Sequence, residues 1–325
     1  HPGTRRFTTT RNRHPGTRRF TTTRNTHTGP AAPRLGAGTS TAAARLGIVG
    51  RGCPLLRSPP MDVQSVLDDL VAEQEALDAV VAPLRPEQWA LATPSPRWSI
   101  ADQIGHLTYF DSTAALAITD SEAFTTHRDE LVASMTDDLA IDDVTLGSFR
   151  ALQPDEQLAE WRRRRDELEQ AGRTLDDTTR VEWYGPSMGS KSFLTARLME
   201  VWAHGQDICD TVGVDRTASD RIRHIAQLGV ITRGWSYMVR GEQPPERAVM
   251  VELAAPSGET WRWNESDDAD TIIGPAVDFC LVVTQRRHPS DTELVISGEA
   301  AEDWMSKAQA FAGGATSGPS PRGDR

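Results

Sequence analysis

Long apolar runs and cysteines are both scarce in this sequence. No stretch of about 18 consecutive apolar residues occurs, the length that a helix needs to cross a bilayer, so no membrane-spanning segment and no membrane partner are predicted. The three cysteines, Cys53, Cys209 and Cys280, lie far apart in the chain. This spacing predicts neither a disulfide framework nor a cysteine zinc site, and we expect a reducing, cytoplasmic environment.

Acidic residues and lysine are missing altogether from residues 1–60, which contain 11 arginines. The segment HPGTRRFTTTRN at 1–12 recurs unchanged at 14–25, and no apolar periodicity is present. Such a composition is typical of a transit peptide or a nucleic-acid-binding arm. We favour a third interpretation: residues 1–60 are a disordered leader outside the native coding sequence, and Met61 is the true first residue.

The rest of the chain has the opposite charge balance. It carries 24 basic and 46 acidic residues, a net charge of -22. Nucleic-acid phosphates require a basic footprint on the protein, so we expect no nucleic-acid partner. A small-molecule substrate is the expected partner, and the composition predicts nothing about protein partners.

Four stretches after Met61 show the spacing of amphipathic helices, and together they predict a helical bundle over 61–215. They begin near residues 61, 99, 154 and 190. Ser99 is a suitable N-cap with Asp102 three residues later, a variant of the capping box. Gly213 suits the left-handed end of the last helix.

The pattern changes beyond the bundle. One helical stretch at about 218–240 is expected within a connector, 216–246. Strand-like RAVMVELAAP, TWRWN and TELVISG then alternate with helix-like PAVDFCLVVTQRR and AAEDWMSKAQAFAG, which predicts a small α+β domain over 247–313. Residues 314–325 are expected to be disordered. The fold class is therefore mainly α, a four-helix bundle followed by a smaller α+β domain.

One polar face of the fourth helix suggests a metal site. Arg197, Glu200, His204 and Asp207 fall on the same side of a helix, and positions four apart bring imidazole and carboxylate to about 5–6 Å. Both groups are good ligands for zinc and its first-row neighbours. Two ligands alone leave the alternative open that Glu200 only forms a surface ion pair, with Arg197 or with His204.

A third ligand has to come from elsewhere in the chain. Five histidines lie outside the leader, and His106 in DQIGHL sits at the edge of an apolar helix stripe, where it can face the bundle interior. A histidine there is also compatible with simple core packing. His224 is the main competitor, while His127 and His288 lie in a charged stretch and before a proline.

The motif WSIADQIGHL, followed about ninety residues later by ARLMEVWAHGQDI, resembles the metal-binding domain of the mycothiol-dependent maleylpyruvate isomerase family, within the DinB-like four-helix bundles. The resemblance covers about 61–215 and is closest to an uncharacterised actinobacterial subgroup; 247–313 is similar to the smaller domain that follows in such proteins. It implies that His106, Glu200 and His204 bind one divalent ion, usually zinc. It also implies mycothiol as a cofactor, whose thiolate adds to a conjugated diacid.

Two aspartates near these residues are expected to orient the imidazoles. Asp207 lies one turn beyond His204, and Asp102 lies one turn before His106. A carboxylate that accepts a hydrogen bond from a ligating histidine fixes the ring. Ordinary helix-surface charge is an equally good interpretation of both.

Three arginines are candidates for binding an anionic substrate or cofactor. Arg197 precedes Glu200 by one turn, and Arg286 and Arg287 end a helix of the small domain. Each can hold a carboxylate through two parallel hydrogen bonds. The alternatives are that Arg197 pairs with Glu200 and that Arg286 and Arg287 complement a helix C-terminus, which is the interpretation we favour for these two taken individually.

Other conspicuous side chains are interpreted as structural. Trp98, Trp183 and Trp202 are expected to pack rather than to stack on a substrate. Cys209 is turned away from Glu200 around the helix, so it is not expected to act as a nucleophile.

Three protein ligands would leave a coordination position open, as catalytic zinc requires. The sequence therefore predicts a thiol-cofactor-dependent isomerase or S-transferase for a small electrophilic or anionic metabolite. A non-catalytic metal-dependent binding or regulatory module is the alternative from another class. A metal-dependent hydrolase is a third, and Asp207 is the one nearby base that the sequence offers it.

Overall fold

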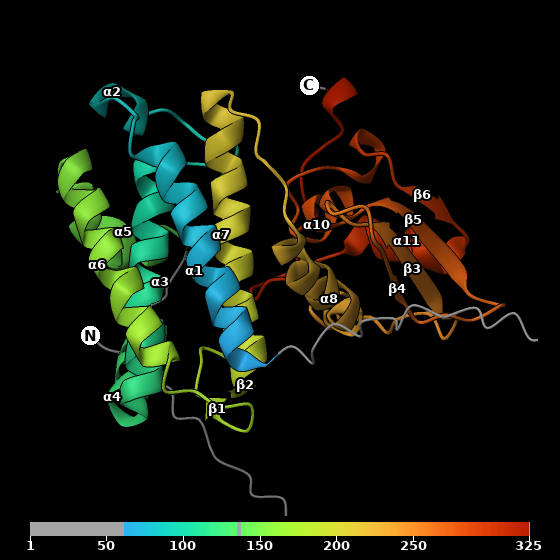
Figure 1. Cartoon of the computed structure of the whole chain (residues 1–325), viewed down its shortest axis with the longest axis horizontal. Coiled ribbons are helices and arrows are strands. Elements are labelled where there is room, and N and C mark those ends of the chain that lie inside the picture. Colours follow the sequence, from blue (N-terminus) through green and yellow to red (C-terminus); the bar gives the residue numbers. More distant parts are fainter. Residues whose placement is uncertain (1–61, 135–137, 325) are drawn as a thin grey trace, which may run out of the picture. The chain divides into compact units, whose positions relative to one another are not determined.

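A computed structural model describes residues 62–134 and 138–324 of the chain. The leader, 1–60, lies outside the described residues. Four long helices run side by side as a bundle: α1 (Val63–Val81), α3 (Ile100–Thr119), α6 (Pro154–Gly172) and α7 (Ser190–Val212) (Figure 1). Helix α1 packs against α6 and α7, and α3 packs against the same two helices from the other side. The predicted helical bundle is confirmed.

The helix ends follow the predicted chemistry. Ser99 and Asp102 form a reciprocal capping box at the start of α3, which satisfies two backbone N–H groups that the helix leaves unpaired. Gly213 ends α7 with φ 69°, a left-handed conformation that costs glycine nothing because it lacks a Cβ atom.

Three further helices near the bundle were not predicted: α2 (Pro86–Trp89), α4 (Ser121–Ser134) and α5 (Asp138–Arg150). Both α4 and α5 pack against α3. Helix α4 buries only Phe124 and Leu131, a stripe too sparse to stand out from the polar residues around it. A short hairpin, β1 (Arg180–Val181) and β2 (Met188–Gly189), leads into α7.

The C-terminal part contains a four-stranded sheet in the order β4-β3-β5-β6. Strand β3 (Val249–Ala254) is antiparallel to β4 (Thr260–Trp263) and parallel to β5 (Asp270–Pro275), which is antiparallel to β6 (Val295–Ser297). Helices α10 (Ala276–Val283) and α11 (Glu299–Lys307) pack on the sheet. Strand β5 is the one strand of this sheet that the sequence analysis missed.

The helix expected over 218–240 is interrupted. It is a 3-10 turn at Asp220–Ile222 followed by α8 (Arg223–Ile231) and α9 (Arg233–Met238), which are separated at Thr232. Helix α8 packs against α7 and α10, whereas α9 packs against α11. The interruption allows the two short helices to bury their apolar residues against different neighbours.

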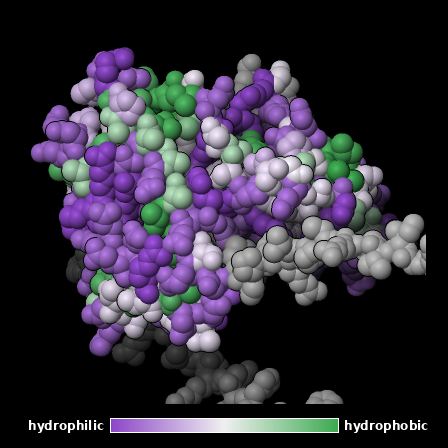
Figure 2. Space-filling model, in the orientation of Figure 1, coloured by the Kyte–Doolittle hydropathy of each residue, from purple (hydrophilic) through white to green (hydrophobic). Residues whose placement is uncertain are grey.

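Hydrophilic residues cover most of the bundle face in view, and apolar residues appear there in smaller groups (Figure 2). This is expected when apolar stripes pack inward. No helix in the described residues is long and apolar enough to cross a membrane. In the C-terminal tail, Thr316 forms hydrogen bonds with Gln285 and Gln309, and the disorder expected for 314–325 stays a prediction.

Candidate metal centre

Two helices bring three ligand-type side chains together in the bundle. Helix α3 contributes His106, and α7 contributes Glu200 and His204. Their ligand atoms all lie within 4.8 Å of one another, the one such group of three in the part of the chain that is described. The Nε2 atoms of His106 and His204 lie 3.2 Å and 3.1 Å from the same oxygen, Oε2 of Glu200.

Burial and mutual contact change the protonation of this group. Burial lowers the pKa of His106 to about 4, and the neighbouring His204 adds to the effect, so His106 is neutral at pH 7. Burial opposes ionisation of Glu200. The contacts of Glu200 with the imidazoles of His106 and His204 outweigh it and hold the pKa of Glu200 well below its usual range. Neutral imidazole and ionised carboxylate are the forms that bind metals.

The second nitrogen of His204 is held by a glutamine that the sequence analysis missed. Nδ1 of His204 lies 2.5 Å from Oε1 of Gln103, which is fully buried. An amide oxygen can only accept, so Nδ1 donates. The amide nitrogen of Gln103 donates to Oγ1 of Thr93 at 2.8 Å and to Oδ2 of Asp207 at 3.4 Å. Gln103 therefore occupies the position expected for Asp207.

Asp207 contributes to the centre indirectly. Its Oδ2 lies 4.0 Å from Nδ1 of His204, too far for a hydrogen bond, and accepts instead from Ser95 and from Nη2 of Arg286, each at 2.9 Å. The expectation that Asp207 binds the imidazole directly is corrected: Gln103 lies between them.

The expectation for Asp102 is also corrected. Its Oδ1 accepts from Nε of Arg150 at 2.7 Å, and its Oδ2 accepts from the backbone and hydroxyl of Ser99. These contacts cap α3 and tie it to α5, and they leave neither oxygen directed at His106.

Aromatic rings line the centre. The ring of Trp98 lies 4.9 Å from the ring of His106 and 5.7 Å from that of His204, measured between centroids. Its indole N–H donates to Asp142 on α5. The ring of Phe110 lies 4.7 Å from that of His106, also measured between centroids. Trp98 therefore packs against both imidazoles, and the expectation that it does not stack on a substrate stays a prediction.

Arg197 does not pair with Glu200. Its guanidinium donates to Oδ1 of Asp111 at 2.9 Å and 3.3 Å, and Nε2 of Gln74 donates to the other carboxylate oxygen at 3.1 Å. Asp111 is fully buried and Arg197 is 3% exposed. The Arg197–Glu200 pair that we considered is therefore wrong, and the guanidinium that we proposed for substrate binding is already engaged by a buried carboxylate.

The two arginines after α10 contact α7. Arg286 donates to Asp207, and Arg287 donates through Nη1 and Nη2 to the two oxygens of Asp210, each at 2.7 Å. Arg286 also donates to the carbonyl of Thr284, the C-cap of α10, at 2.7 Å, in line with the complementing role that we favoured. Substrate binding by Arg286 or Arg287 stays a prediction, because no contact tests it.

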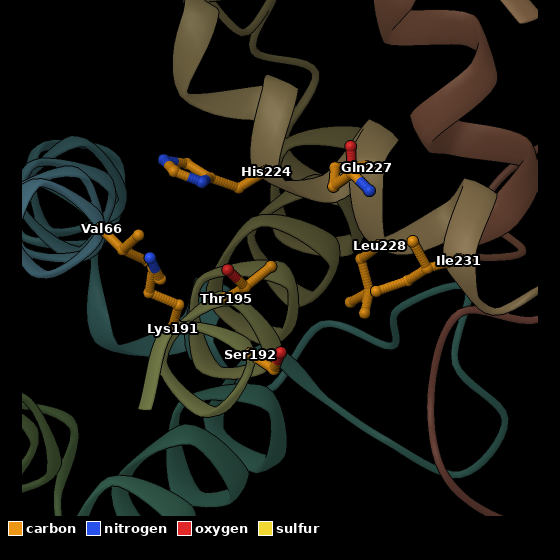
Figure 3. Close-up of a pocket in the computed structure, with 8 residues that line it drawn as sticks. All are labelled: Val66, Lys191, Ser192, Thr195, His224, Gln227, Leu228 and Ile231. Atoms are coloured by element: carbon orange, nitrogen blue, oxygen red, sulfur yellow. The ribbon is translucent and has the colours of Figure 1, made fainter. Parts of the chain in front are cut away.

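His224, the competing ligand, lies elsewhere. Its Nε2 is 2.8 Å from Oδ2 of Asp69 on α1. Figure 3 shows the imidazole directed toward α1, at the edge of a pocket of about 170 Å³ between α1, α7 and α8. No metal-ligand group of three forms there among the described residues.

The remaining side chains keep structural positions. Trp183 stacks on Phe124, and Trp202 packs beneath the guanidinium of Arg216. Cys209 is buried, and burial raises the pKa of its thiol to about 11, so it is protonated and a poor nucleophile at pH 7.

The comparisons with known proteins agree with this architecture. The family model described as the mycothiol maleylpyruvate isomerase N-terminal domain matches residues 70–209. Two uncharacterized proteins, from two strains of Mycobacterium tuberculosis, are each 43% identical over 245 residues, which span 75% of this chain and 94% of theirs.

A crystal structure of a histidine-to-alanine mutant of the mycothiol-dependent maleylpyruvate isomerase has a similar fold, with a TM-score of 0.51 at 15% identity. The similarity covers 74% of this chain and 95% of that chain. The bundle is of the DinB-like type, and the chain belongs to the mycothiol maleylpyruvate isomerase family.

Proposed function

We propose that His106, Glu200 and His204 bind one divalent cation, with zinc the best match. We further propose that the protein is a mycothiol-dependent isomerase or S-transferase for a small electrophilic or anionic metabolite. The metal proposal rests on the geometry of the three side chains, and the thiol proposal rests on family membership.

The main support for the metal proposal is that the imidazole proton of His204 lies on Nδ1. Because Nδ1 of His204 donates to Gln103, a neutral ring has only a lone pair at Nε2. That lone pair faces Oε2 of Glu200 at 3.1 Å, and a carboxylate oxygen also offers only lone pairs. Two acceptors at this distance repel each other, whereas a cation between them attracts both.

The spacing suits such a cation. Oxygen and nitrogen ligands lie about 2.0–2.1 Å from zinc, so two ligands of a tetrahedral ion are about 3.3 Å apart. The separations from Glu200 Oε2 are 3.2 Å to His106 and 3.1 Å to His204. The donor set of two imidazoles and one carboxylate also matches zinc.

The proposed site would leave a coordination position open. It has three candidate protein ligands in the described residues, fewer than the four of a structural zinc site, and the Glu200 side chain is 24% exposed. A divalent ion held here would stabilise a thiol in its thiolate form at neutral pH. Trp98 packs against both imidazoles and Phe110 against that of His106, which would limit water around the two rings.

A hydrolase is less well supported. It needs a free general base within hydrogen-bond reach of the reacting group. Asp207 is 3% exposed and already accepts hydrogen bonds from Ser95 and Arg286. The role of base that the sequence allowed for Asp207 is therefore incompatible with its contacts.

Metal content is the first test. We expect about one zinc or similar ion per purified chain by elemental analysis, and loss of that ion in His106→Ala and in His204→Ala. His224→Ala is the matched control, because it removes a buried histidine paired with a carboxylate outside the centre. Parent protein that stays metal-free after incubation with zinc would refute the metal centre. His106 and His204 would then be donors to Glu200, with His204 doubly protonated.

The thiol requires a separate test. Calorimetric titration with mycothiol should show binding to the metal-loaded protein and weak or no binding after the metal is removed by a chelator. Turnover is then measured with maleylpyruvate, the substrate named for the related structure, in the presence and absence of mycothiol. Metal-loaded protein that does not bind mycothiol would favour the non-catalytic module.

A further inference from the structure

We propose that Arg286 is a positioning residue for the metal centre: it holds the Asp207–Gln103 pair that orients the imidazole of His204. The role of this imidazole as a ligand rests on the proposed function, whereas its orientation by Arg286 does not. The inference follows from three consecutive contacts between a C-terminal segment and the ligand, and it concerns a residue more than eighty positions away from His204 in the sequence.

Arg286 forms hydrogen bonds with the turn of α7 that contains His204. Its Nε donates to the carbonyl of Ala203 at 3.2 Å, and its Nη2 donates to Oδ2 of Asp207 at 2.9 Å. Its Nη1 donates to the carbonyl of Thr284, which fixes the guanidinium to its own segment. The guanidinium therefore contacts the residue before His204 and the residue three positions after it, and the Arg286 side chain is only 13% exposed.

Asp207, held in place by Arg286, in turn accepts a hydrogen bond from Gln103. Its Oδ2 accepts from Nε2 of Gln103 at 3.4 Å, while the second amide hydrogen goes to Oγ1 of Thr93 at 2.8 Å. The Thr93 hydroxyl donates to the carbonyl of Trp98, so its oxygen is an acceptor for the amide. Both amide hydrogens thus have acceptors, and the amide cannot rotate without placing its oxygen against the Asp207 carboxylate.

The amide orientation then determines the imidazole. With its nitrogen held by Asp207 and Thr93, Gln103 presents only Oε1 to His204. This fixes the proton on Nδ1 and points Nε2 at Glu200. A charge-assisted bond from Arg286 also compensates the buried negative charge of Asp207, which lies 4.0 Å from Nδ1 of His204. A series of hydrogen bonds thus links Arg286, in the C-terminal part of the chain, to His204, a proposed metal ligand in the bundle.

Arg287 provides a matched comparison in the same segment. It forms a two-pronged ion pair with Asp210, one turn of α7 beyond Asp207, and its side chain is 15% exposed. Asp210 has no contact with Gln103 or His204 among the described hydrogen bonds, and its other partner is Gln206. Arg287 therefore joins the same segments as Arg286 but does not reach the imidazole.

The test compares Arg286→Met, Arg287→Met and Gln103→Leu with the parent full-length chain. The first readout is zinc affinity, measured by competition with a chromophoric chelator. Loss of a residue that orients a metal ligand weakens binding on the order of 10- to 100-fold, which we expect for Gln103→Leu. Arg286→Met should weaken binding about 10-fold, at the lower end of that range. Arg286→Lys, which keeps the charge beside Asp207, should recover part of the loss. Arg287→Met should match the parent.

The second readout needs no metal. The Nδ1 proton of His204, assigned by its absence in His204→Gln, should appear as a downfield imidazole resonance protected from solvent exchange. Protection should disappear in Gln103→Leu, fall in Arg286→Met and persist in Arg287→Met. Equal loss of protection in Arg286→Met and Arg287→Met, or an unchanged Arg286→Met, would overturn the positioning role. If the parent shows the protected proton and the expected variant pattern but binds no zinc, the metal proposal fails and the positioning role stands.

Discussion

The buried pair of Arg197 and Asp111 offers a quantitative test of the bundle core. Replacing Arg197 by methionine removes the cation and leaves a fully buried carboxylate whose remaining hydrogen bond comes from Gln74. Breaking a buried pair from one side costs about 3–5 kcal/mol, because the remaining charge stays desolvated without a partner. We therefore expect Arg197→Met to lower the free energy of unfolding by about 3–5 kcal/mol at pH 7.5.

The cost should depend on pH with a defined sign. Burial already raises the pKa of Asp111 above its ordinary value of 3.8, and the charge and hydrogen bonds of Arg197 oppose that rise. Without Arg197 the pKa rises further, so the folded variant takes up a proton at a higher pH than the unfolded chain. Protonation removes the uncompensated charge, so the deficit should be largest at pH 7.5 and smaller near pH 5.

Urea unfolding followed by tryptophan fluorescence, with a chelator present to remove metal, measures both effects. Arg197→Met/Asp111→Asn should recover most of the loss, because no buried charge remains. Arg173→Met is the surface control: Arg173 pairs with Asp68, both side chains are more than 40% exposed, and such pairs contribute about 0–1 kcal/mol. A loss below about 1 kcal/mol in Arg197→Met, or a deficit that grows on acidification, would refute this account of the core.

Two further predictions test local features of the same fold. With metal removed, the free energy of unfolding should fall as the pH drops from about 6.5 to about 4, by on the order of 3 kcal/mol, since the unfolded chain takes up a proton at His106 in this window and the folded chain does not. In His106→Gln, the free energy of unfolding measured with urea should depend much less on pH between about 6.5 and about 4. A parent protein whose free energy of unfolding does not change over this pH range would contradict the assignment. Gly229→Ala places a Cβ atom 2.9 Å from Val283 and should cost about 1–3 kcal/mol by thermal unfolding. Gly234→Ala, where a Cβ atom meets nothing within 4 Å, should not be destabilising, and equal losses in both would show that contact with α10 is not the cause.

Local sequence signals were sufficient to predict the helical bundle. The capping residues of α3 and the glycine that ends α7 act within one turn of helix, and their chemistry is visible in the sequence. Glu200 and His204 were recognisable for the same reason, since residues four apart on a helix share a face. Helix α4 lacked such a signal because it buries only Phe124 and Leu131.

Contacts between distant segments set the limit of the prediction. Asp102 and Asp207 were chosen because each lies one helical turn from a histidine, yet tertiary contacts direct both elsewhere. Gln103 was overlooked because a helical glutamine has no pattern of its own. Its position against His204 depends on the packing of α3 on α7, and only the acceptors on Thr93 and Asp207 determine which way the amide faces. An N–H donor requirement at Nδ1 of His204 could have prompted a search for a neutral acceptor on α3.

The paired arginines also change how an anionic ligand would be attracted to this acidic protein. Arg197 is neutralised by Asp111 and Arg286 by Asp207, so the arginines near the centre contribute no excess positive charge. Neutral His106 adds none, and ionised Glu200 leaves a negative charge at the site itself. A divalent cation on the three proposed ligands would reverse this sign. The metal, rather than an arginine, would then be the group that attracts a thiolate or a carboxylate, and binding of either anion should require metal.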